Sequence, residues 1–242
     1  MNLHAAPDSA ALLGALDRDG FAVTAPLVDP AACARLANLY DGGAQFRSTV
    51  SMARHGFGQG EYKYFAYPLP PLIDSLRRQW YARLAPTANA WSARLIDHSA
   101  AGGPIEADDA WPAELDALIA RCNAAGQNRP TPLLLRYGPG DYNCLHQDLY
   151  GDIHFPLQVI LLLDRPGADL DGGELILVEQ RPRRQSRPMV VPLAQGSFAI
   201  VPVKQRPVNG PRGTYRVQMR HGVSRIHRGQ RRSLGLIFHD AA

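Results

Sequence analysis

The sequence predicts an α+β protein in which helices come first and strands follow. Helical patterns dominate residues 1–128, whereas short apolar runs between Gly/Pro turns dominate residues 129–242. The 22 glycines and 20 prolines fit a turn-rich β half. No repeat or low-complexity linker separates the halves, so we expect residues 1–242 to form a single domain with the helices packed on a sheet.

Capping residues define the first two helices. Asp8 or Ser9 can cap a helix that ends at Gly20. Asp29 followed by Pro30 is a cap and first-turn pair, and it opens a second helix that runs to about residue 40. Both capping signals depend only on neighbouring residues, so they predict where these helices start but not how the helices pack.

Three further helices are expected before the strands begin. Leu72, Leu76, Trp80 and Leu84 recur at helical spacing, which predicts a helix over residues 71–84. Pro86 should break it, because proline donates no backbone N–H, and a separate helix is expected over residues 87–96. The last helix should cover residues 111–125, before a glycine.

Seven short runs in the second half have strand character. They are rich in branched aliphatic and aromatic residues, are bounded by turn residues, and together predict an antiparallel sandwich or barrel. The runs are Leu133–Tyr137, Leu157–Leu163, Leu175–Val178, Met189–Val191, Ser197–Val201, Tyr215–Met219 and Ser233–Phe238.

Residues 46–70 fit neither half, and we expect a long loop or hairpin that acts as a substrate lid. Aromatic side chains next to cations in such a lid could stack a base and hold a phosphate. A hydrophobic hairpin packed on the mouth of the barrel is an equally good interpretation. The candidate substrate residues are Arg54, His55, Tyr62, Tyr64 and Tyr67, with Phe65 and Lys63 beside them.

Composition favours a reducing compartment and argues against a membrane protein. The three cysteines, Cys33, Cys122 and Cys144, include no CxxC pair, so neither a disulfide framework nor a disulfide-linked partner is expected. The N-terminus has no signal-peptide pattern, and no run approaches the roughly 20 apolar residues of a membrane span. We therefore expect a cytoplasmic protein.

Charge is distributed unevenly along the chain. Residues 181–232 hold twelve Arg, one Lys and no acidic residue, which gives +13; since the whole chain carries +4, the rest carries −9. Such a basic segment favours a polyanionic partner, here single-stranded or damaged DNA or RNA. A solvated basic face is the alternative interpretation.

A candidate metal site begins with the H-x-D of His146 and Asp148. Residues two apart in an extended strand project to the same side, so the imidazole and the carboxylate should converge. The motif is weak alone, and a third ligand must come from elsewhere. His221, 75 residues after His146, is the best candidate, because two His and one carboxylate leave the open positions that non-haem iron oxygenases need.

An arginine follows the third candidate ligand at ten residues. Arg231 and Ser233 should share one face of a strand, where a guanidinium and a hydroxyl suit a carboxylate. His227 competes with His221 as the third ligand, but no arginine lies ten residues beyond His227. Arg232 should face away from Arg231.

Three other residues near these motifs have simpler interpretations. His154 reads as a turn residue, and His239 should be exposed near the C-terminal end. Cys144 lies two residues before His146, so a strand would place both on one face, although a small core residue is the simpler interpretation.

These motifs resemble the 2-oxoglutarate/iron(II) dioxygenase superfamily, with its double-stranded β-helix (jelly-roll) core. The phrase RYGPGDYNCLHQD resembles that of AlkB-type nucleic-acid dealkylases, with the same nine-residue step from Tyr137 to His146. DLDGGEL and HGV…GQRRS resemble prolyl-hydroxylase-like members. The whole chain, including ARHGFGQGEY and YFAYPLP, resembles a bacterial family of AlkB-related oxygenases presumed to act on damaged nucleic acid.

The resemblance implies iron(II) on His146, Asp148 and His221, and 2-oxoglutarate on Arg231 with help from Ser233 and Tyr137. Oxygen would be the second co-substrate, and ascorbate a reductant. The sequence departs from the AlkB pattern at Leu135, where those enzymes have Asn, and its ten-residue step from His221 to Arg231 is prolyl-hydroxylase-like.

The implied activity is oxidative dealkylation (demethylation) of damaged DNA or RNA bases. Hydroxylation of a protein side chain or small molecule is the alternative, and a non-catalytic metal-binding barrel is a third interpretation. In the last case Arg231 and Ser233 would have no role.

Overall fold

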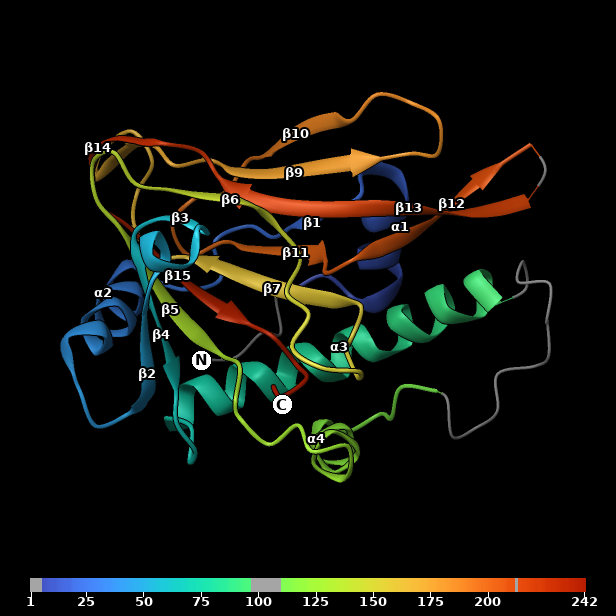
Figure 1. Cartoon of the computed structure of the whole chain (residues 1–242), viewed down its shortest axis with the longest axis horizontal. Coiled ribbons are helices and arrows are strands. Elements are labelled where there is room, and N and C mark those ends of the chain that lie inside the picture. The colour runs from blue at the N-terminus through green and yellow to red at the C-terminus, as the bar shows by residue number, and fades with distance from the viewer. Residues whose placement is uncertain (1–5, 97–109, 212) are drawn as a thin grey trace.

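The computed structural model describes residues 6–96, 110–211 and 213–242. Two antiparallel sheets face each other, and helices cover the outer side of the larger sheet (Figure 1). The helices are α1 (Ser9–Asp19), α2 (Pro30–Asn38), α3 (Pro71–Ile96) and α4 (Leu115–Ala124), with short 3-10 turns η2 (Leu39–Asp41) and η3 (Met52–His55). Within the described ranges, no helix is long and apolar enough to cross a membrane.

The larger sheet has the strand order β1-β11-β7-β15-β5-β4-β2. The smaller sheet has the order β10-β9-β13-β6-β3, with β12 also paired to β13, and β14 pairs with β8. In chain order the strands are β1 (Ala22–Val23), β2 (Phe46–Ser51), β3 (Gly58–Gln59), β4 (Glu61–Phe65), β5 (Leu133–Tyr137), β6 (Tyr142–His146), β7 (Leu157–Leu162), β8 (Leu170–Gly172), β9 (Leu175–Gln180), β10 (Arg187–Val191), β11 (Phe198–Pro202), β12 (Gln205–Gly210), β13 (Gly213–Val223), β14 (Ile226–Gly229) and β15 (Arg231–Leu236).

Strand alternation divides the core into two layers. In β7 and β11, Leu161 and Ile200 face the helices and join the large hydrophobic cluster, whereas Ile160 and Val201 face the smaller sheet. All four side chains are buried. The central strands are therefore apolar on both faces, and the space between the sheets is available for a cavity.

The two predicted capping sites are confirmed. The Asp8 carboxylate accepts the N–H of Ala11 at 2.8 Å, and Gly20 ends α1 with φ +83°. The Asp29 carboxylate accepts the N–H of Ala32 at 2.8 Å in front of α2. Each cap satisfies a helix N–H that has no partner within the helix.

The predicted helix break at Pro86 is wrong. α3 runs without interruption through Pro86 to Ile96. Contacts with α1 hold both sides of the proline. Before it, Ser9 Oγ donates to the Arg83 carbonyl at 2.8 Å; after it, Thr87 Oγ1 donates to the Ser9 carbonyl, and Arg94 pairs with Asp17. These contacts and the burial of Trp91 offset the loss of a helix hydrogen bond, which typically costs about 3 kcal/mol. The helix predicted over 111–125 is confirmed as α4, which begins later, at Leu115.

The segment predicted as a lid loop is a hairpin within the larger sheet. β2 pairs with β4, and β4 pairs with β5, so these two strands extend the larger sheet, while β3 between them pairs with β6 of the smaller sheet. The expectation of a mostly helical first half was therefore incomplete. β4 could be recognised only with its partner β5, which lies about 70 residues further along the chain.

A buried arginine joins α3 to the C-terminal segment. The Arg77 guanidinium donates to the carbonyls of Ile237 and Phe238, both at 3.0 Å, and to the Asp240 carboxylate at 2.8 Å. The side chains of Arg77 and Asp240 are 1% and 0% exposed. The Tyr67 hydroxyl accepts from Arg77 at 2.9 Å and donates to Asp240 at 2.9 Å.

The last residues continue toward the smaller sheet. The Ala242 N–H donates to the Tyr150 carbonyl at 2.9 Å, and Ala241 exchanges backbone hydrogen bonds with Arg129. Gln127 Nε2 donates to the Asp240 carbonyl at 2.6 Å. The C-terminal segment thus contacts both α3 and the turn that follows β6.

Candidate functional site

A cavity of about 280 Å³ lies between the two sheets. Both the candidate metal ligands and the candidate 2-oxoglutarate residues line it, together with apolar side chains from β5, β7 and β9. A concave, mostly apolar cavity with a few converging polar groups is the usual form of a small-molecule site.

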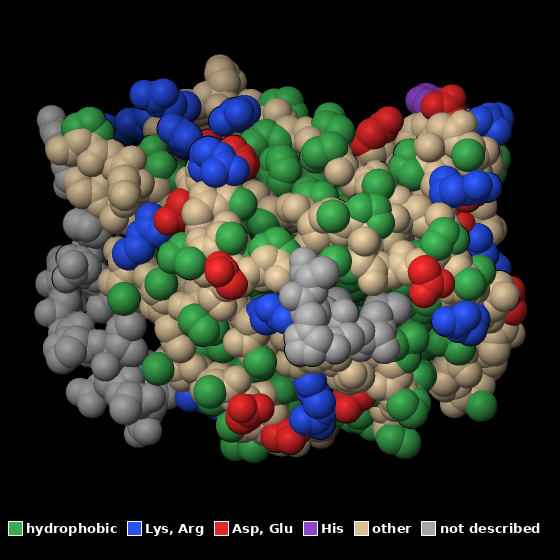
Figure 2. All heavy atoms as spheres, turned by 180° about the vertical axis from the view of Figure 1, so that it is seen from behind, with side chains coloured by type: hydrophobic (Ala, Val, Ile, Leu, Met, Phe, Trp, Pro, Cys, Tyr) green, Lys and Arg blue, Asp and Glu red, His purple; other side chains and the backbone are tan. Residues whose placement is uncertain are grey.

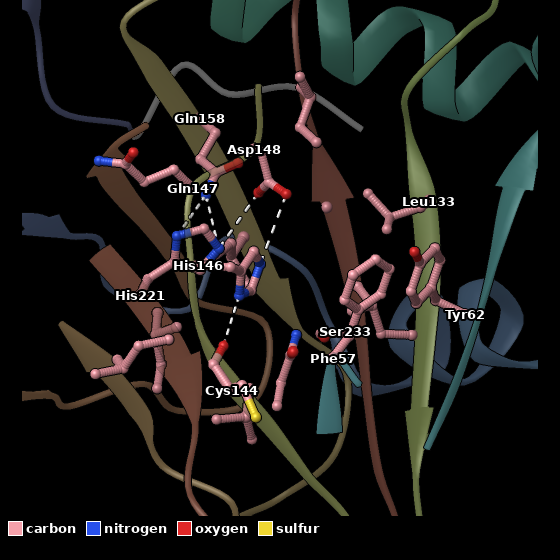
Figure 3. Close-up of a pocket in the computed structure, with 18 of the residues that line it drawn as sticks. Phe57, Tyr62, Leu133, Cys144, His146, Gln147, Asp148, Gln158, His221 and Ser233 are labelled. Carbon is pink, nitrogen blue, oxygen red and sulfur yellow. Dashed lines mark hydrogen bonds and ion pairs between the residues drawn. The ribbon is translucent and has the colours of Figure 1, made fainter. Parts of the chain in front are cut away.

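His146, Asp148 and His221 converge in this cavity (Figure 3). His146 ends β6 and lies directly opposite His221 on β13. Asp148 lies two residues beyond His146, past the end of the strand, and its side chain turns back toward both rings. Pairing between strands 75 residues apart therefore brings the third candidate ligand to the H-x-D motif.

The distances fit a single ion. One ligand atom from each of the three residues lies within 4.8 Å of the others. Asp148 Oδ2 is 3.3 Å from His221 Nε2, and Asp148 Oδ1 is 3.6 Å from His146 Nε2. Two imidazole nitrogens and one carboxylate oxygen form the donor set of a facial triad, so these residues fit a divalent iron.

Burial and local contacts shift the pKa of His146 and of Asp148. Burial and the neighbouring His221 lower the pKa of His146, which keeps its imidazole neutral. His146 Nδ1 lies 2.7 Å from the Cys144 carbonyl, so this nitrogen carries the proton and Nε2 keeps its lone pair. Burial alone would raise the pKa of Asp148, but the two histidines hold it well below its usual range.

Sequence reasoning missed three residues that position the triad. The Tyr150 hydroxyl donates to Asp148 Oδ1 at 2.7 Å, and Gln158 Nε2 lies 3.1 Å from His221 Nε2. Gln147 Nε2 donates to the carbonyls of Lys204 and Met219, at 3.0 and 2.8 Å, and so fastens the H-x-D segment to β13. Tyr150 follows Asp148 by two residues, which was the only sequence signal for any of these contacts.

Arg231 is a buried cation in the same cavity. Its side chain donates to the Gly173 carbonyl at 2.8 Å and to Ser233 Oγ at 2.9 Å, and the residue is 2% exposed. Burial lowers its pKa, yet a guanidinium stays protonated at neutral pH. Among the described residues, no carboxylate lies within ion-pair distance of Arg231. A buried, uncompensated charge is costly, so this arrangement favours an anionic ligand.

Ser233 and Tyr137 accompany Arg231 as the sequence predicts. Tyr137 on β5 is the register partner of Arg231 on β15, and the guanidinium carbon lies 5.7 Å from the centre of the Tyr137 ring. Burial raises the pKa of Tyr137, so its hydroxyl remains neutral; Asn143 Nδ2 donates to it at 3.3 Å. Arg232 alternates away from the cavity and pairs with Asp164.

The candidate substrate residues are separated in the structure. Tyr62 lines the cavity, and Arg54 and His55 are exposed on η3 beside it. Tyr64 is buried beneath Arg47 and does not line the cavity, while Tyr67 points to Asp240. Within the predicted lid segment, Gly56 and Phe57 before β4 and Tyr62 in the first half of β4 line the cavity.

The remaining histidines do not join the three. His227 is exposed on β14, and His154 is partly buried in a loop. His239 is fully buried, so its predicted exposure was wrong: Nδ1 accepts the Phe155 N–H at 3.2 Å beneath the turn that follows β6. Because the C-terminal segment packs inward, position near the chain end did not indicate exposure.

The basic segment 181–232 does not form one surface. Arg206 is buried with Glu179, Arg231 lines the cavity, and Arg232 pairs with Asp164. Arg183 and Arg184 lie beyond the end of β9, and Figure 2 shows Lys and Arg side chains gathered at that end of the molecule. Arg212 lies outside the described residues.

The turn between β9 and β10, which carries Arg183 and Arg184, is distant from the cavity. Leu175, at the start of β9, lines the cavity, and β9 runs for six residues, from Leu175 to Gln180, before the turn begins. At 3.2–3.4 Å per residue, that length is roughly 20 Å. Arg54, on η3 beside the cavity-lining residues Gly56 and Phe57, is therefore nearer to the cavity than Arg183 and Arg184 are.

A family model and known proteins match this chain over most of its length. The family model described as an oxygenase catalysing oxidative methylation of damaged DNA matches residues 60–241. An uncharacterised protein of Mycobacterium tuberculosis, strain H37Rv, is 46% identical over 178 residues, which cover 74% of this chain and 72% of that protein. A protein of strain CDC 1551 matches equally well.

Solved structures share the fold at low identity. A prolyl-4-hydroxylase of Pseudomonas putida matches with a TM-score of 0.53 and 16% identity, over 96% of this chain and 100% of that one. An oxidoreductase of the 2OG-Fe(II) oxygenase family from Burkholderia pseudomallei matches with a TM-score of 0.53 and 16% identity, over 98% and 94%. These likenesses confirm the jelly-roll core.

Proposed function

Since this chain belongs to the family of oxygenases described as acting on damaged DNA, within the 2-oxoglutarate/iron(II) superfamily, we propose that it removes alkyl groups oxidatively from nucleic-acid bases. Iron(II) and 2-oxoglutarate are the cofactor and co-substrate of this superfamily, with O2 as the oxidant. The unpaired state of Cys33, Cys122 and Cys144 and a nucleic-acid substrate favour the cytoplasm as its location.

His146, Asp148 and His221 are proposed to hold the iron. Their donor atoms fit a facial triad, and the hydrogen bonds from Tyr150 to Asp148 and from His146 to the Cys144 carbonyl orient two of the ligands in advance. Such outer contacts fix the direction of each donor, so the chain is organised for a metal before it binds one.

Arg231 provides the observation that carries the proposal. A guanidinium with no carboxylate partner among the described residues lies beside a hydroxyl, in the cavity that also holds the three candidate ligands. 2-Oxoglutarate has one carboxylate for such a group and a 2-oxo acid end that chelates a metal. We propose that Arg231 and Ser233 bind the distal carboxylate, with the Tyr137 hydroxyl as a further donor.

When bound, iron(II) with 2-oxoglutarate and O2 supplies the oxidative decarboxylation to succinate and the hydroxylation of a substrate C–H bond. The chain's own contribution is positional. Arg231 sets the depth of the co-substrate, Tyr150 and Gln158 hold Asp148 and His221, and Leu133, Ile160 and other apolar side chains exclude water. A hydroxylated N-alkyl group would then collapse and release an aldehyde.

The substrate is tested by succinate release against a panel of oligonucleotides. With iron(II) and 2-oxoglutarate, we expect N-methylated single-stranded DNA or RNA to raise succinate release above the substrate-free rate, with aldehyde formed in equal amount. Unmethylated oligonucleotides of the same sequence are the control. Binding should weaken as salt rises, because phosphate contacts release counterions.

The panel also decides between the two enzyme classes. Stimulation by a peptide or by a free small molecule, with none by any methylated nucleic acid, would replace dealkylation by hydroxylation. Absence of any iron-dependent succinate release would reject the oxygenase itself.

Arg231→Lys should weaken 2-oxoglutarate binding. Lysine keeps the charge but loses the two-pronged geometry and the bond to Ser233, and charged hydrogen bonds contribute about 1.5–3 kcal/mol. We expect the KM for 2-oxoglutarate to rise about 10- to 150-fold. Arg232→Lys is the matched control, because the neighbouring Arg232 pairs with Asp164 outside the cavity. A KM equal to the wild-type value in Arg231→Lys would contradict the assignment.

A further inference from the structure

An exposed aromatic ring lies at the mouth of the cavity. Phe57 lines the cavity and is still 48% exposed. Its backbone lies against β6, the strand that carries His146, and Figure 3 labels it with Tyr62 among the residues that line the cavity. Most of the exposed large apolar side chains among the described residues lie in or beside β3 and β6: Phe57, Tyr142, Leu145 and Leu149. An apolar rim of this kind marks an interaction surface.

The backbone that carries Phe57 is fixed on both sides. The Phe57 N–H donates to the Met52 carbonyl at 3.1 Å, and its carbonyl accepts the Cys144 N–H at 2.9 Å. The next residue, Gly58, has φ +131°, and a Cβ there would lie 2.4 Å from the Tyr142 carbonyl oxygen. The backbone that presents the exposed ring is therefore held against β6, and little backbone freedom would be lost when the ring binds a partner.

Basic side chains lie next to the ring. The imidazole of His55 stacks on Phe57, with ring centres 5.3 Å apart and planes at 21°. Arg54 precedes His55 on η3 and is exposed. Neither Arg54 nor His55 forms an ion pair with any residue in the described ranges. An aromatic face beside unpaired basic groups is the arrangement with which proteins bind single-stranded nucleic acid.

We propose that Phe57 stacks against the base next to the target base, which makes single-stranded nucleic acid of two nucleotides or more the preferred substrate. This inference rests on the proposed dealkylation. A base that enters the cavity must leave its stack, and its neighbour then has one uncovered face. Phe57 covers that face at the mouth, while Arg54 lies near the connecting phosphate.

The alternative occupant is an apolar side chain of a peptide. The unpaired charge at this rim is positive, which suits a phosphate between two bases better than an uncharged peptide backbone. Stacking tolerates every base, so the rim would select substrates by strand length and not by base sequence.

The test compares one methylated base in two contexts: within a single-stranded oligonucleotide and as the free nucleoside. The variants are Phe57→Ala, Phe57→Trp and the control Val190→Ala, whose side chain is 59% exposed on β10 and does not line this cavity. We expect Phe57→Ala to lower kcat/KM for the oligonucleotide by about 5- to 150-fold, the range for one lost base–aromatic stack. Its kcat/KM for the nucleoside should equal that of the wild type, and Phe57→Trp should retain oligonucleotide activity.

A binding measurement without metal gives a second readout. Fluorescence anisotropy of a labelled, unmethylated single strand should show weaker binding to Phe57→Ala than to the wild type or to Val190→Ala. In Phe57→Trp, base stacking should quench the added tryptophan fluorescence. Equal oligonucleotide binding by Phe57→Ala and the wild type would overturn the inference, as would an equal loss on oligonucleotide and nucleoside.

The two proposals fail in different ways. If methylated nucleic acid supports succinate release but Phe57→Ala matches the wild type on both substrates, only the stacking role is lost. If no methylated nucleic acid is turned over while a peptide is, the proposed dealkylation is rejected and the rim binds an apolar peptide side chain instead.

Discussion

Asp148→Ala is expected to abolish iron-dependent succinate release. The substitution removes the single carboxylate of the triad and leaves two imidazoles, which hold a divalent iron poorly. Loss of an outer partner of a metal ligand typically costs 10- to 100-fold in metal affinity or activity, so loss of the ligand itself should cost more than about 100-fold. Coupled succinate assays at saturating 2-oxoglutarate, together with iron titration, measure the effect.

Asp152→Ala is the matched control for this variant. Asp152 is exposed in the turn four residues further along the chain, and its loss should leave turnover unchanged. Thermal melting of Asp148→Ala shows whether the fold survives, since the Tyr150 hydroxyl loses its acceptor. A folded Asp148→Ala protein with wild-type succinate release would disprove the metal assignment.

Arg77→Met is expected to cause the largest loss of stability. The substitution leaves the Asp240 carboxylate buried without its cation and leaves the Ile237 and Phe238 carbonyls without donors. Breaking a buried ion pair by removing one partner costs about 3–5 kcal/mol in the free energy of unfolding. For a chain of this length, 1 kcal/mol corresponds to about 2–4 °C, so the Tm should fall by roughly 6–20 °C.

The adjacent residue provides the control for Arg77. Arg78 pairs with Asp74 and Asp116 on the surface, with 46% of its side chain exposed. Exposed pairs contribute about 0–1 kcal/mol, so Arg78→Met should change the Tm little. The double variant Arg77→Met, Asp240→Asn should recover part of the loss, because the unpaired buried charge is gone. Equal melting of the two single variants would show that Arg77 is not essential to the core.

The sequence predicted those features that depend on local chemistry. Asp8 and Asp29 cap their helices, and β5 has the predicted bounds Leu133–Tyr137. The H-x-D spacing identified His146 and Asp148, and the ten-residue step identified Arg231. The catalytic roles of these residues stay predictions, as does the division of the chain into one domain over residues 1–242.

Features that depend on distant partners were not predictable. β4 is recognisable only through its pairing with β5, and β2 only through its pairing with β4. α3 passes Pro86 because contacts with α1 hold both sides of the proline. Arg77 reads as an ordinary helix-surface cation until the C-terminal segment is packed beside it. The exposure of Phe57 could likewise not be predicted, because its segment contains several aromatic residues.

The C-terminal segment links overall integrity to the chemistry. Ala242 is bonded to the backbone of Tyr150, and the Tyr150 hydroxyl orients Asp148. A protease that trimmed the final residues would spare every proposed ligand yet loosen the support of the one carboxylate among them. Clipped material should therefore mimic an iron-depleted preparation, and intact mass ought to be checked before poor activity is blamed on missing metal.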